Sequence, residues 1–394
     1  MRIVLATHAF DGVGGSETYL LTVAEQLQRL GHGVTIYAVA LGKVAELARA
    51  RAIDIVAELD DLSDHCDVVI AQDGGVSYEL ADRWPQTPQL FVCHSGFFDL
   101  QLPPLVPGVV GAVVVLSDRV ERRIRALDVP HRIVRLRQPI DTERLVPRAG
   151  ARKRPIRALL LGNYLRGDAR RALVEAWAAA GVEVVQVGVP TNTTLHPEQD
   201  IAQADIVVGK GRAILDAMSC GRAAYVYDAF GTDGWVTPEV YPLMEADAFA
   251  GQALPRVVDS DQLRRELDDY RPLMGQVNRE LIMNHHQART HAEQLVDLSR
   301  ELVPAASPNT TARRELARMI RLKWRAEAEL FGLRSDFAPV AAEAVELRAG
   351  LADATERAER AERALDAFMG QRRVRAGLAL GRMADWLRAF GRRK

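Results

Sequence analysis

Short apolar runs rich in valine and isoleucine alternate, along residues 1–145, with stretches in which apolar side chains recur every three or four positions. The short runs are typical of buried strands, and the longer spacing is typical of amphipathic helices. Their alternation is characteristic of a parallel sheet wrapped by helices. The pattern predicts strands at residues 3–6, 34–38, 68–71, 89–93, 112–116 and 133–136, with helices at 16–30 and 118–127.

A second series of the same kind follows a polar stretch, punctuated by proline and glycine, at residues 147–155. Such a stretch is typical of an interdomain linker. We therefore predict an α/β fold of two Rossmann-like domains facing a cleft, residues 1–145 and 157–303, with a linker at 146–156. The second domain is expected to have strands at 157–161, 182–187, 205–208 and 223–227, helices at 166–180, 212–220 and 261–270, and a closing helix at 274–302 that leans back over the first domain.

Residues 304–394 are predicted to form a helical extension. A basic amphipathic helix at 312–331 follows an interruption at 304–311, and apolar residues then keep an alternating four–three spacing over 340–368. This spacing predicts a coiled coil. Because its alanine-rich seam buries little apolar area, a homo-oligomer through 340–368 and packing on the chain's own domains both stay open. The seam consists of Val340, Ala344, Leu347, Leu351, Ala354, Ala358, Ala361, Leu365 and Phe368.

The last segment, residues 371–394, carries eight arginine or lysine residues against the single acid Asp385. Its apolar residues can share one face of a helix, so one interpretation is a helix that binds an anionic membrane surface. A solvated basic helix and a partner-binding tail are the alternatives. Since these features suggest assembly or attachment, we expect residues 1–303 to fold and bind nucleotide without the extension.

The composition of the chain excludes several classes of function. The formal charge of -1 gives no general attraction to nucleic acid, and 48% hydrophobic residues can fill substantial cores. Three scattered cysteines argue against a disulfide framework or a zinc site, and we expect no metal. There is no signal-peptide pattern and no uncharged apolar run of the ~20 residues that span a bilayer. We expect a cytoplasmic protein, peripheral at the inner membrane face if the tail binds lipid.

The most informative stretch, residues 208–221, joins a glycine-rich turn to a helix that carries an acid. Gly209 and Gly211 let the backbone approach a diphosphate, toward which the amides of the following helix point. Lys210 and Arg212 add positive charge. Asp216 lies about one helical turn further on, where a carboxylate can accept ribose hydroxyls. The stretch therefore predicts a nucleotide site.

This stretch resembles the donor-site signature of the retaining GT-B glycosyltransferases of family 4, a glutamate and a second glutamate eight positions later, in a context like EGFGLPLLEAMACG. Asp216 falls on the second glutamate, and Ala217, Met218, Cys220 and Gly221 match as they stand. Val208 stands where the family has the first glutamate, which orients the donor sugar. A valine cannot form that hydrogen bond.

The resemblance extends to the first domain. Gly14 and Gly15 lie in a turn like the family's Gly-Gly-x-Glu, with Ser16 a candidate helix N-cap, although a tight strand–helix turn explains the same residues. His94 directly follows a predicted strand, at the edge where open α/β sheets bind ligands. Many family members have a histidine there, near the transferred sugar; the alternative is a structural histidine. Residues 138–144 resemble a segment that ends the family's first domain, and we predict a structural role for them.

Two places in the second domain complete the predicted donor site. Asn163 and Arg166 occupy the position of the two cations with which the family grips the donor diphosphate. The alternative for Arg166 is a solvated first turn of a helix. Gly231 and Gly234 replace the loop that approaches the donor sugar, since glycine permits close backbone approach.

The resemblance implies transfer of a sugar from a nucleotide-sugar donor to a glycan, lipid-linked or protein acceptor, with retention and without a metal or a cofactor. No protein nucleophile is needed, and the enzyme supplies preorganised charge for the leaving diphosphate. Lys210 and His94 are the candidate catalytic residues. Because Val208 and Asn163 depart from the family pattern, a degenerate GT-B module that binds nucleotide or serves as a scaffold is the alternative.

Overall fold

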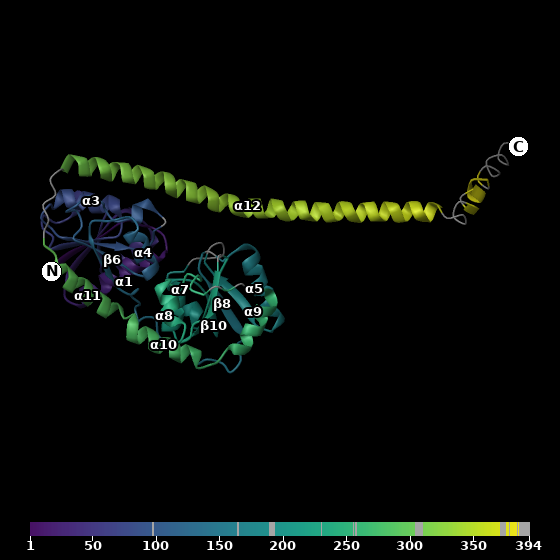
Figure 1. Ribbon diagram of the computed structural model, residues 1–394, viewed down its shortest axis with the longest axis horizontal. Coiled ribbons are helices and arrows are strands. Elements are labelled where there is room, and N and C mark those ends of the chain that lie inside the picture. Colours follow the sequence, from purple (N-terminus) through teal and green to yellow (C-terminus); the bar gives the residue numbers. More distant parts are fainter. Residues whose placement is uncertain are drawn as a thin grey trace. The chain divides into compact units, whose positions relative to one another are not determined.

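The computed structural model describes residues 1–394 except 97, 164, 189–193, 230, 255, 257, 304–309, 371–375, 378, 384 and 386–394 (Figure 1). It divides into two compact units, Met1–Glu327 and Ala328–Lys394. The first unit contains both α/β domains. Each unit is considered separately below.

The N-terminal domain is built on a parallel sheet, as the sequence predicts. Among the described residues seven strands pair in the order β3-β2-β1-β4-β5-β6-β7. Apolar side chains fill the core on both faces of this sheet, which explains why its central strands read as continuous apolar runs. The strands are β1 (Arg2–Phe10), β2 (Gly33–Leu41), β3 (Asp54–Val56), β4 (Val68–Ala71), β5 (Gln89–Cys93), β6 (Ala112–Val115) and β7 (Arg132–Arg135).

The helices of this domain are α1 (Gly15–Arg29), α2 (Lys43–Ala50), α3 (Gly74–Arg83) and α4 (Asp118–Arg125), with short 3₁₀ turns η1 (Leu59–Asp61) and η2 (Asp99–Gln101). The sequence predicted α1 and α4 but did not identify β3, α2 or α3. Strand β3 is a three-residue edge strand. Helix α3 opens on two glycines, which are poor helix formers.

The C-terminal domain has a second sheet, and its described strands follow the order β12-β11-β10-β8-β9. Strands β8 to β11 are parallel, and β12 runs antiparallel to β11 at one edge. The elements are β8 (Arg157–Leu161), α5 (Gly167–Ala179), β9 (Glu183–Val187), α6 (Pro197–Ile201), β10 (Ile206–Gly209), α7 (Arg212–Ser219), β11 (Ala223–Asp228), β12 (Gly231–Trp235), α8 (Tyr241–Ala246), α9 (Ser260–Glu266) and η3 (Leu267–Asp269).

The predicted closing helix is two helices, α10 (Met274–His285) and α11 (Ala288–Glu301). The break lies where the chain pairs with the segment 138–144: the carbonyl of His286 accepts the Ile140 amide at 2.7 Å, and the Ala288 amide donates to the Ile140 carbonyl at 3.1 Å. Helix α11 then packs against α1 of the first domain, where Tyr19 Oη lies 2.8 Å from His291 Nε2. The predicted return to the first domain is therefore confirmed for α11.

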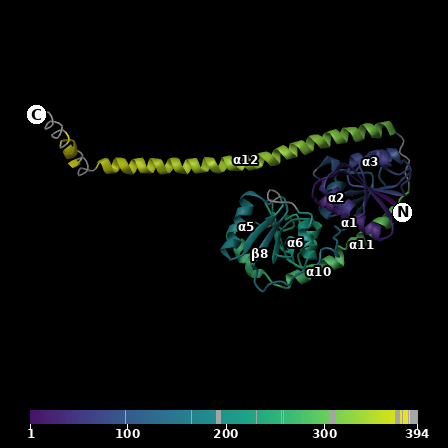
Figure 2. The ribbon, with the colours of Figure 1, turned by 180° about the vertical axis from the view of Figure 1, so that it is seen from behind.

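Helix α12 (Thr310–Gly370) joins the two helical segments that the sequence predicted separately, and it runs through Pro339 (Figures 1 and 2). Its first turns pack on the N-terminal domain. Ala317 is buried there, and Leu316 and Ile320 contact the same apolar cluster as α3. Residues 310–327 consequently belong to the first unit. The separate extension begins at 328 and not at 304.

Within the second unit, residues 328–370 continue α12 and expose apolar members of the predicted seam, among them Val340, Leu347 and Leu351. Neighbouring turns are joined by ion pairs between Arg357 and Asp353 and between Arg360 and Glu356. Most of the cationic segment 371–394, on which the membrane hypothesis depends, lies outside the described residues.

Candidate functional site

The turn between β10 and α7 consists of two residues, Lys210 and Gly211. Val208 lies inside β10 and is buried in the apolar core, so it belongs to the sheet and not to a loop. A side chain at Gly209 would place its Cβ 2.5 Å from the carbonyl oxygen of Leu161 on the neighbouring strand. Gly211 has a φ of 59°, and its amide donates to the carbonyl of Phe249 at 2.9 Å. The strand packing and the turn both require glycine.

Asp216 is buried on α7, with 7% of its surface exposed. Its Oδ1 lies 3.6 Å from Nε of Arg212, and neither atom has a hydrogen-bond partner in the described part of the chain. Burial raises the pKa of Asp216, while the charges of Arg212 and Arg144 lower it. A buried carboxylate oxygen without a partner is rare in folded proteins and is a candidate ligand contact.

Arg212 is turned away from solvent and toward the N-terminal domain. Its guanidinium donates to the carbonyl of Pro139 at 3.3 Å and to Thr22 Oγ1 on α1 at 3.4 Å. Burial lowers its pKa, and the neighbouring Asp216 opposes that change. Arg212 therefore bridges the donor helix and the first domain in this structure.

Lys210 pairs with Asp228, the last residue of β11. The lysine side chain is 29% exposed and that of the aspartate 2%. The ammonium thus compensates a buried carboxylate at the edge where the parallel strands end. Lys210, one of the cations predicted to bind a diphosphate, is therefore already paired with this acid.

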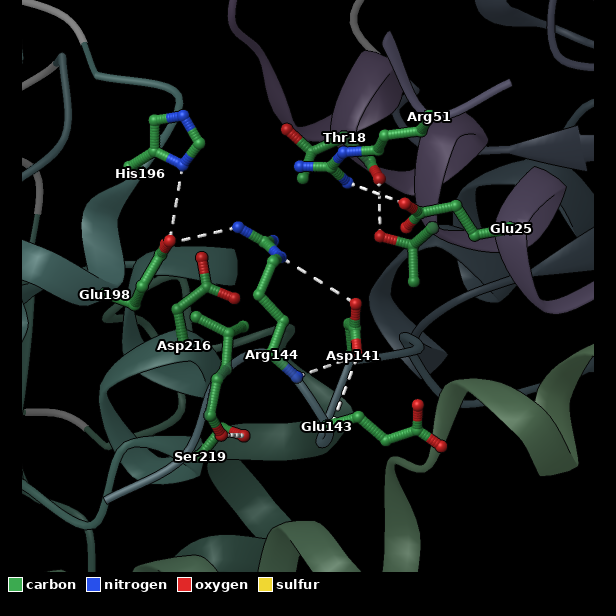
Figure 3. A network of polar contacts seen from close by, with 12 residues as sticks. Thr18, Glu25, Arg51, Asp141, Glu143, Arg144, His196, Glu198, Asp216 and Ser219 are labelled. Carbon is green, nitrogen blue, oxygen red and sulfur yellow. Dashed lines mark hydrogen bonds and ion pairs between the residues drawn. The ribbon is translucent and has the colours of Figure 1, made fainter. Parts of the chain in front are cut away.

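A polar network surrounds Asp216 (Figure 3). Arg144 lies 3.1 Å from Glu198 on α6 and 3.7 Å from Asp141, and Glu198 also contacts His196 at 3.3 Å. Arg144 and Asp141 come from the segment that the sequence indicated to be structural. The sequence did not indicate that this segment lies beside α7, because the segment, α6 and α7 are brought together by contacts between residues far apart in the chain.

Asn163 and Arg166 follow β8, whose carboxyl end adjoins Gly209. Arg166 caps α5, and its Nε is buried without a hydrogen-bond partner among the described residues. Gly188 has a φ of 127°, and a Cβ there would lie 3.0 Å from Asn163 Oδ1. The structure thus brings Asn163 and Arg166 to the same sheet edge as the turn before α7.

Gly231 and Gly234 lie in the antiparallel strand β12, where the sequence predicted a loop. A Cβ at Gly231 would lie 2.1 Å from the carbonyl oxygen of Gly251, and one at Gly234 would lie 2.0 Å from a guanidinium nitrogen of Arg256. These contacts account for both glycines through packing of β12.

In the N-terminal domain Gly14 is the N-cap of α1, and no side chain caps this helix. The predicted N-cap Ser16 lies inside the helix and donates to the carboxylate of Glu17 at 3.0 Å. A Cβ at Gly14 would meet that carboxylate at 2.3 Å, whereas one at Gly15 would meet nothing within 4 Å. Burial raises the pKa of Glu17.

His94 lies after β5, as predicted, and is partly exposed. Its Nε2 lies 2.9 Å from Gln72 Oε1, and its ring meets the ring of Tyr19 edge-on, with 4.6 Å between centroids. Burial lowers the pKa of His94 to about 3, with smaller contributions from His291 and Arg212. The imidazole is therefore neutral at neutral pH.

A cavity of about 730 Å³ lies between the two domains, beside the end of β7 and helices α8, α10 and α11. Its charged lining includes Arg135, Arg137 and Glu245, and Arg135 bonds Glu245 at 2.6 Å. His291 also lines it and connects it, through Tyr19, to His94. None of the site residues predicted from the sequence is among the described residues that line it.

Within the described residues, no group of three or more histidine, cysteine, aspartate or glutamate side chains has an arrangement suited to a metal ion. No helix in the same part of the chain is long and apolar enough to cross a bilayer.

Several solved structures share this architecture. Anabaena HepE in complex with UDP has a TM-score of 0.56 at 12% identity, and the match covers 77% of this chain and 100% of that chain. A glycosyltransferase from Rickettsia africae has a TM-score of 0.53 at 14% identity, over 76% of this chain and 98% of that chain. Sucrose-phosphate synthase from Thermosynechococcus elongatus has a TM-score of 0.51 at 16% identity, over 76% and 98% of the two chains.

No protein-family model and no curated protein sequence matches the chain. The structural likenesses confirm the predicted GT-B fold of two Rossmann-like domains over about three quarters of the chain.

Proposed function

We propose that this protein is a glycosyltransferase that moves a sugar from a nucleotide-diphosphate donor to an acceptor hydroxyl. The GT-B fold supports the proposal, and two of the similar structures are of HepE with UDP and with UDP-glucose. The acceptor is a glycan, a lipid-linked saccharide or a protein, and the protein acts in glycan or glycoconjugate synthesis.

The observation that carries the proposal is the buried Oδ1 of Asp216, which has no hydrogen-bond partner among the described residues and lies on the helix that follows the central strand β10. In open α/β sheets ligands bind outside the carboxyl ends of the strands, and a carboxylate there can accept the hydroxyls of a ribose. A bound nucleotide would supply the hydrogen bonds that Asp216 lacks.

Diphosphate recognition falls in our proposal to Arg166, whose Nε is buried and unpartnered, and to Lys210. Fixed cations in a site that excludes water stabilise a leaving diphosphate without a metal ion. Asn163 replaces the first of the two cations that the family uses. In our proposal the two positive charges therefore come from Arg166 and Lys210. We propose transfer with retention, with the neutral imidazole of His94 beside the reacting sugar.

The test is calorimetric titration of the full chain with UDP and other nucleoside diphosphates. Replacing Asp216 with Asn should lower affinity by about tenfold or more, because a charged acceptor of ribose hydroxyls is lost. Glu183→Gln, which alters an exposed acid of the same domain, is the matched control and should bind as the wild type does. Unchanged affinity of a folded Asp216→Asn protein contradicts the site, and product analysis with nucleotide-sugars tests the transfer itself.

A second function, a nucleotide-binding scaffold without turnover, is favoured by one observation. Val208, which stands at the family's first glutamate, is a core residue of β10, and Lys210, which we assign to the diphosphate, is already paired with Asp228. The scaffold hypothesis predicts nucleotide binding with no release of sugar from any donor. Self-association through residues 340–368 is compatible with either function, and light scattering of the full chain tests it.

A further inference from the structure

A second group of buried polar atoms lies at the carboxyl edge of the N-terminal sheet, away from the donor helix. His8 is near the end of β1, and Asp73 follows β4 as the N-cap of α3. Their exposed surfaces are 7% and 4%. One oxygen of Asp73 accepts the His8 amide at 2.6 Å and the Thr7 hydroxyl at 3.1 Å. The cluster therefore forms part of the sheet edge itself.

Two atoms of this cluster have no hydrogen-bond partner in the described part of the chain, Asp73 Oδ1 and His8 Nδ1. Burial raises the pKa of Asp73 to about 7 and lowers that of His8 to about 4. The imidazole is thus neutral, and its Nδ1 can donate or accept. Buried polar atoms left without partners cost stability, and native proteins retain them mainly where a ligand or water completes them.

Helix α12 forms the other side of the cluster. The ring of Trp324 lies 4.0 Å from that of His8, at an angle of 54°, and is partly exposed. Glu327 Oε2 is also buried, and within the described residues it has no hydrogen-bond partner. Arg321 pairs with Glu79 on α3 and donates to Tyr37 Oη at 3.3 Å, which fixes this part of α12 on the domain.

A hydrogen-bonded chain connects the cluster to His94. Asp73 accepts the Thr7 hydroxyl, Gln72 Nε2 donates to Thr7 Oγ1 at 3.0 Å, and Gln72 Oε1 lies 2.9 Å from His94 Nε2. The residues at the edges of β1, β4 and β5 are thus held in one polar row. One end of that row is Asp73, which accepts the amide of His8, the residue that meets Trp324; the other end is His94.

We infer that His8, Asp73, Trp324 and Glu327 form a carbohydrate-binding subsite for the acceptor, and that the first turns of α12 supply one wall of it. The partly exposed ring of Trp324 meets His8, whose amide is bound by Asp73, so an aromatic ring, an imidazole and a carboxylate are brought together. Such a combination is the chemistry that binds a neutral, hydroxyl-rich sugar ring. The identification of the bound sugar as the acceptor rests on the proposed function. The sugar binding itself is independent of nucleotide. The helix that precedes the exposed seam thereby determines acceptor specificity.

The probe is a set of methyl glycosides of glucose, galactose, mannose and N-acetylglucosamine, with saturation-transfer NMR on the full chain in the absence of nucleotide. At least one glycoside should receive saturation from the wild-type protein. Trp324→Ala should reduce that signal roughly threefold to tenfold, because the aromatic contact is lost. Affinity for UDP, measured separately, should not change. Met319→Ala removes an exposed apolar side chain of the same helix and is the matched control.

Glu327→Ala provides a second variant, since its described partner is only a 3.9 Å ion pair with Lys323 at the surface. It should also weaken the glycoside signal, and it decides the question if Trp324→Ala does not fold. The inference is overturned if no glycoside binds the wild type, or if folded variants at 324 and 327 keep the full signal. A failure of the donor site is distinguishable, because it removes UDP binding and leaves the glycoside signal intact.

Discussion

The two α/β domains of this protein differ in how their charged groups are satisfied. On the C-terminal domain Lys210 pairs with Asp228, and Arg212 lies between Asp216 and the first domain. On the N-terminal domain one side-chain atom of Asp73 and one of His8 have no hydrogen-bond partner among the described residues, and the His8 ring meets Trp324 of α12. The donor site that we propose is built largely from within its own domain, whereas the acceptor subsite that we propose is completed by a helix more than 200 residues later in the chain. Under this proposal a helix outside the GT-B core belongs to the site.

The strongest test of this difference is to end the chain before or after the first turns of α12. A chain ending at residue 303 should lose on the order of 3–6 kcal/mol of unfolding free energy relative to one ending at 327, since Leu316, Ala317 and Ile320 no longer cover the domain. Urea denaturation measures this. The chain ending at 327 should match the full protein. Equal stability of the two shortened chains would show that α12 contributes no packing energy.

The donor-side ion pair gives the next largest effect. Lys210→Met leaves the buried carboxylate of Asp228 without its cation, and we expect a loss of about 3 kcal/mol, as for other broken buried pairs. Adding Asp228→Asn should recover most of it, because the uncompensated charge is then gone. A double-mutant cycle by denaturation measures the coupling. Additive effects would mean that the pair is not formed in solution.

The predicted site glycines should separate into those fixed by packing and those that are not. Gly209→Ala should cost about 1–3 kcal/mol, since its Cβ meets the Leu161 carbonyl at 2.5 Å. Gly15→Ala, in the first turn of α1 with nothing within 4 Å, should be neutral or slightly stabilising. Thermal unfolding of the two variants makes the comparison. A similar melting temperature for both would contradict the close approach of β8 and β10.

The smallest effect concerns pH. The folded-state pKa of His94 is lowered to about 3 by burial, so its contribution to stability is fully present above its ordinary pKa of 6.5 and is lost as the pH falls toward 3. Between pH 7.5 and pH 5 this loss is at most about 2 kcal/mol, at about 1.4 kcal/mol per pKa unit. His94→Gln should lose less stability than the wild type over that interval, as calorimetry at the two pH values can measure. Parallel losses would mean that His94 is protonated as easily in the folded as in the unfolded chain.

Local periodicity was sufficient to predict most of the parallel strands and the two-domain order, whereas the return of α11 to the first domain was expected from the resemblance to GT-B enzymes. The strands and the domain order depend on short-range alternation of apolar and polar residues, which a sheet covered on both faces imposes directly. The sequence missed β12 because its glycines and Asp233 are typical of loops. That edge strand forms through tertiary contacts with Gly251 and Arg256.

The sequence by itself determined the GT-B architecture and the position of Asp216 on a helix after a central strand, because a strand, a glycine turn and an amphipathic helix are encoded by neighbouring residues. Only the tertiary structure decided which charges are already paired. Lys210 and Asp228 meet at the ends of two adjacent strands, and α12 contacts His8 and Glu79 although it lies more than 200 residues further along the chain. Such contacts leave no periodic pattern, since they depend on where separate elements pack and not on the spacing of residues within one element.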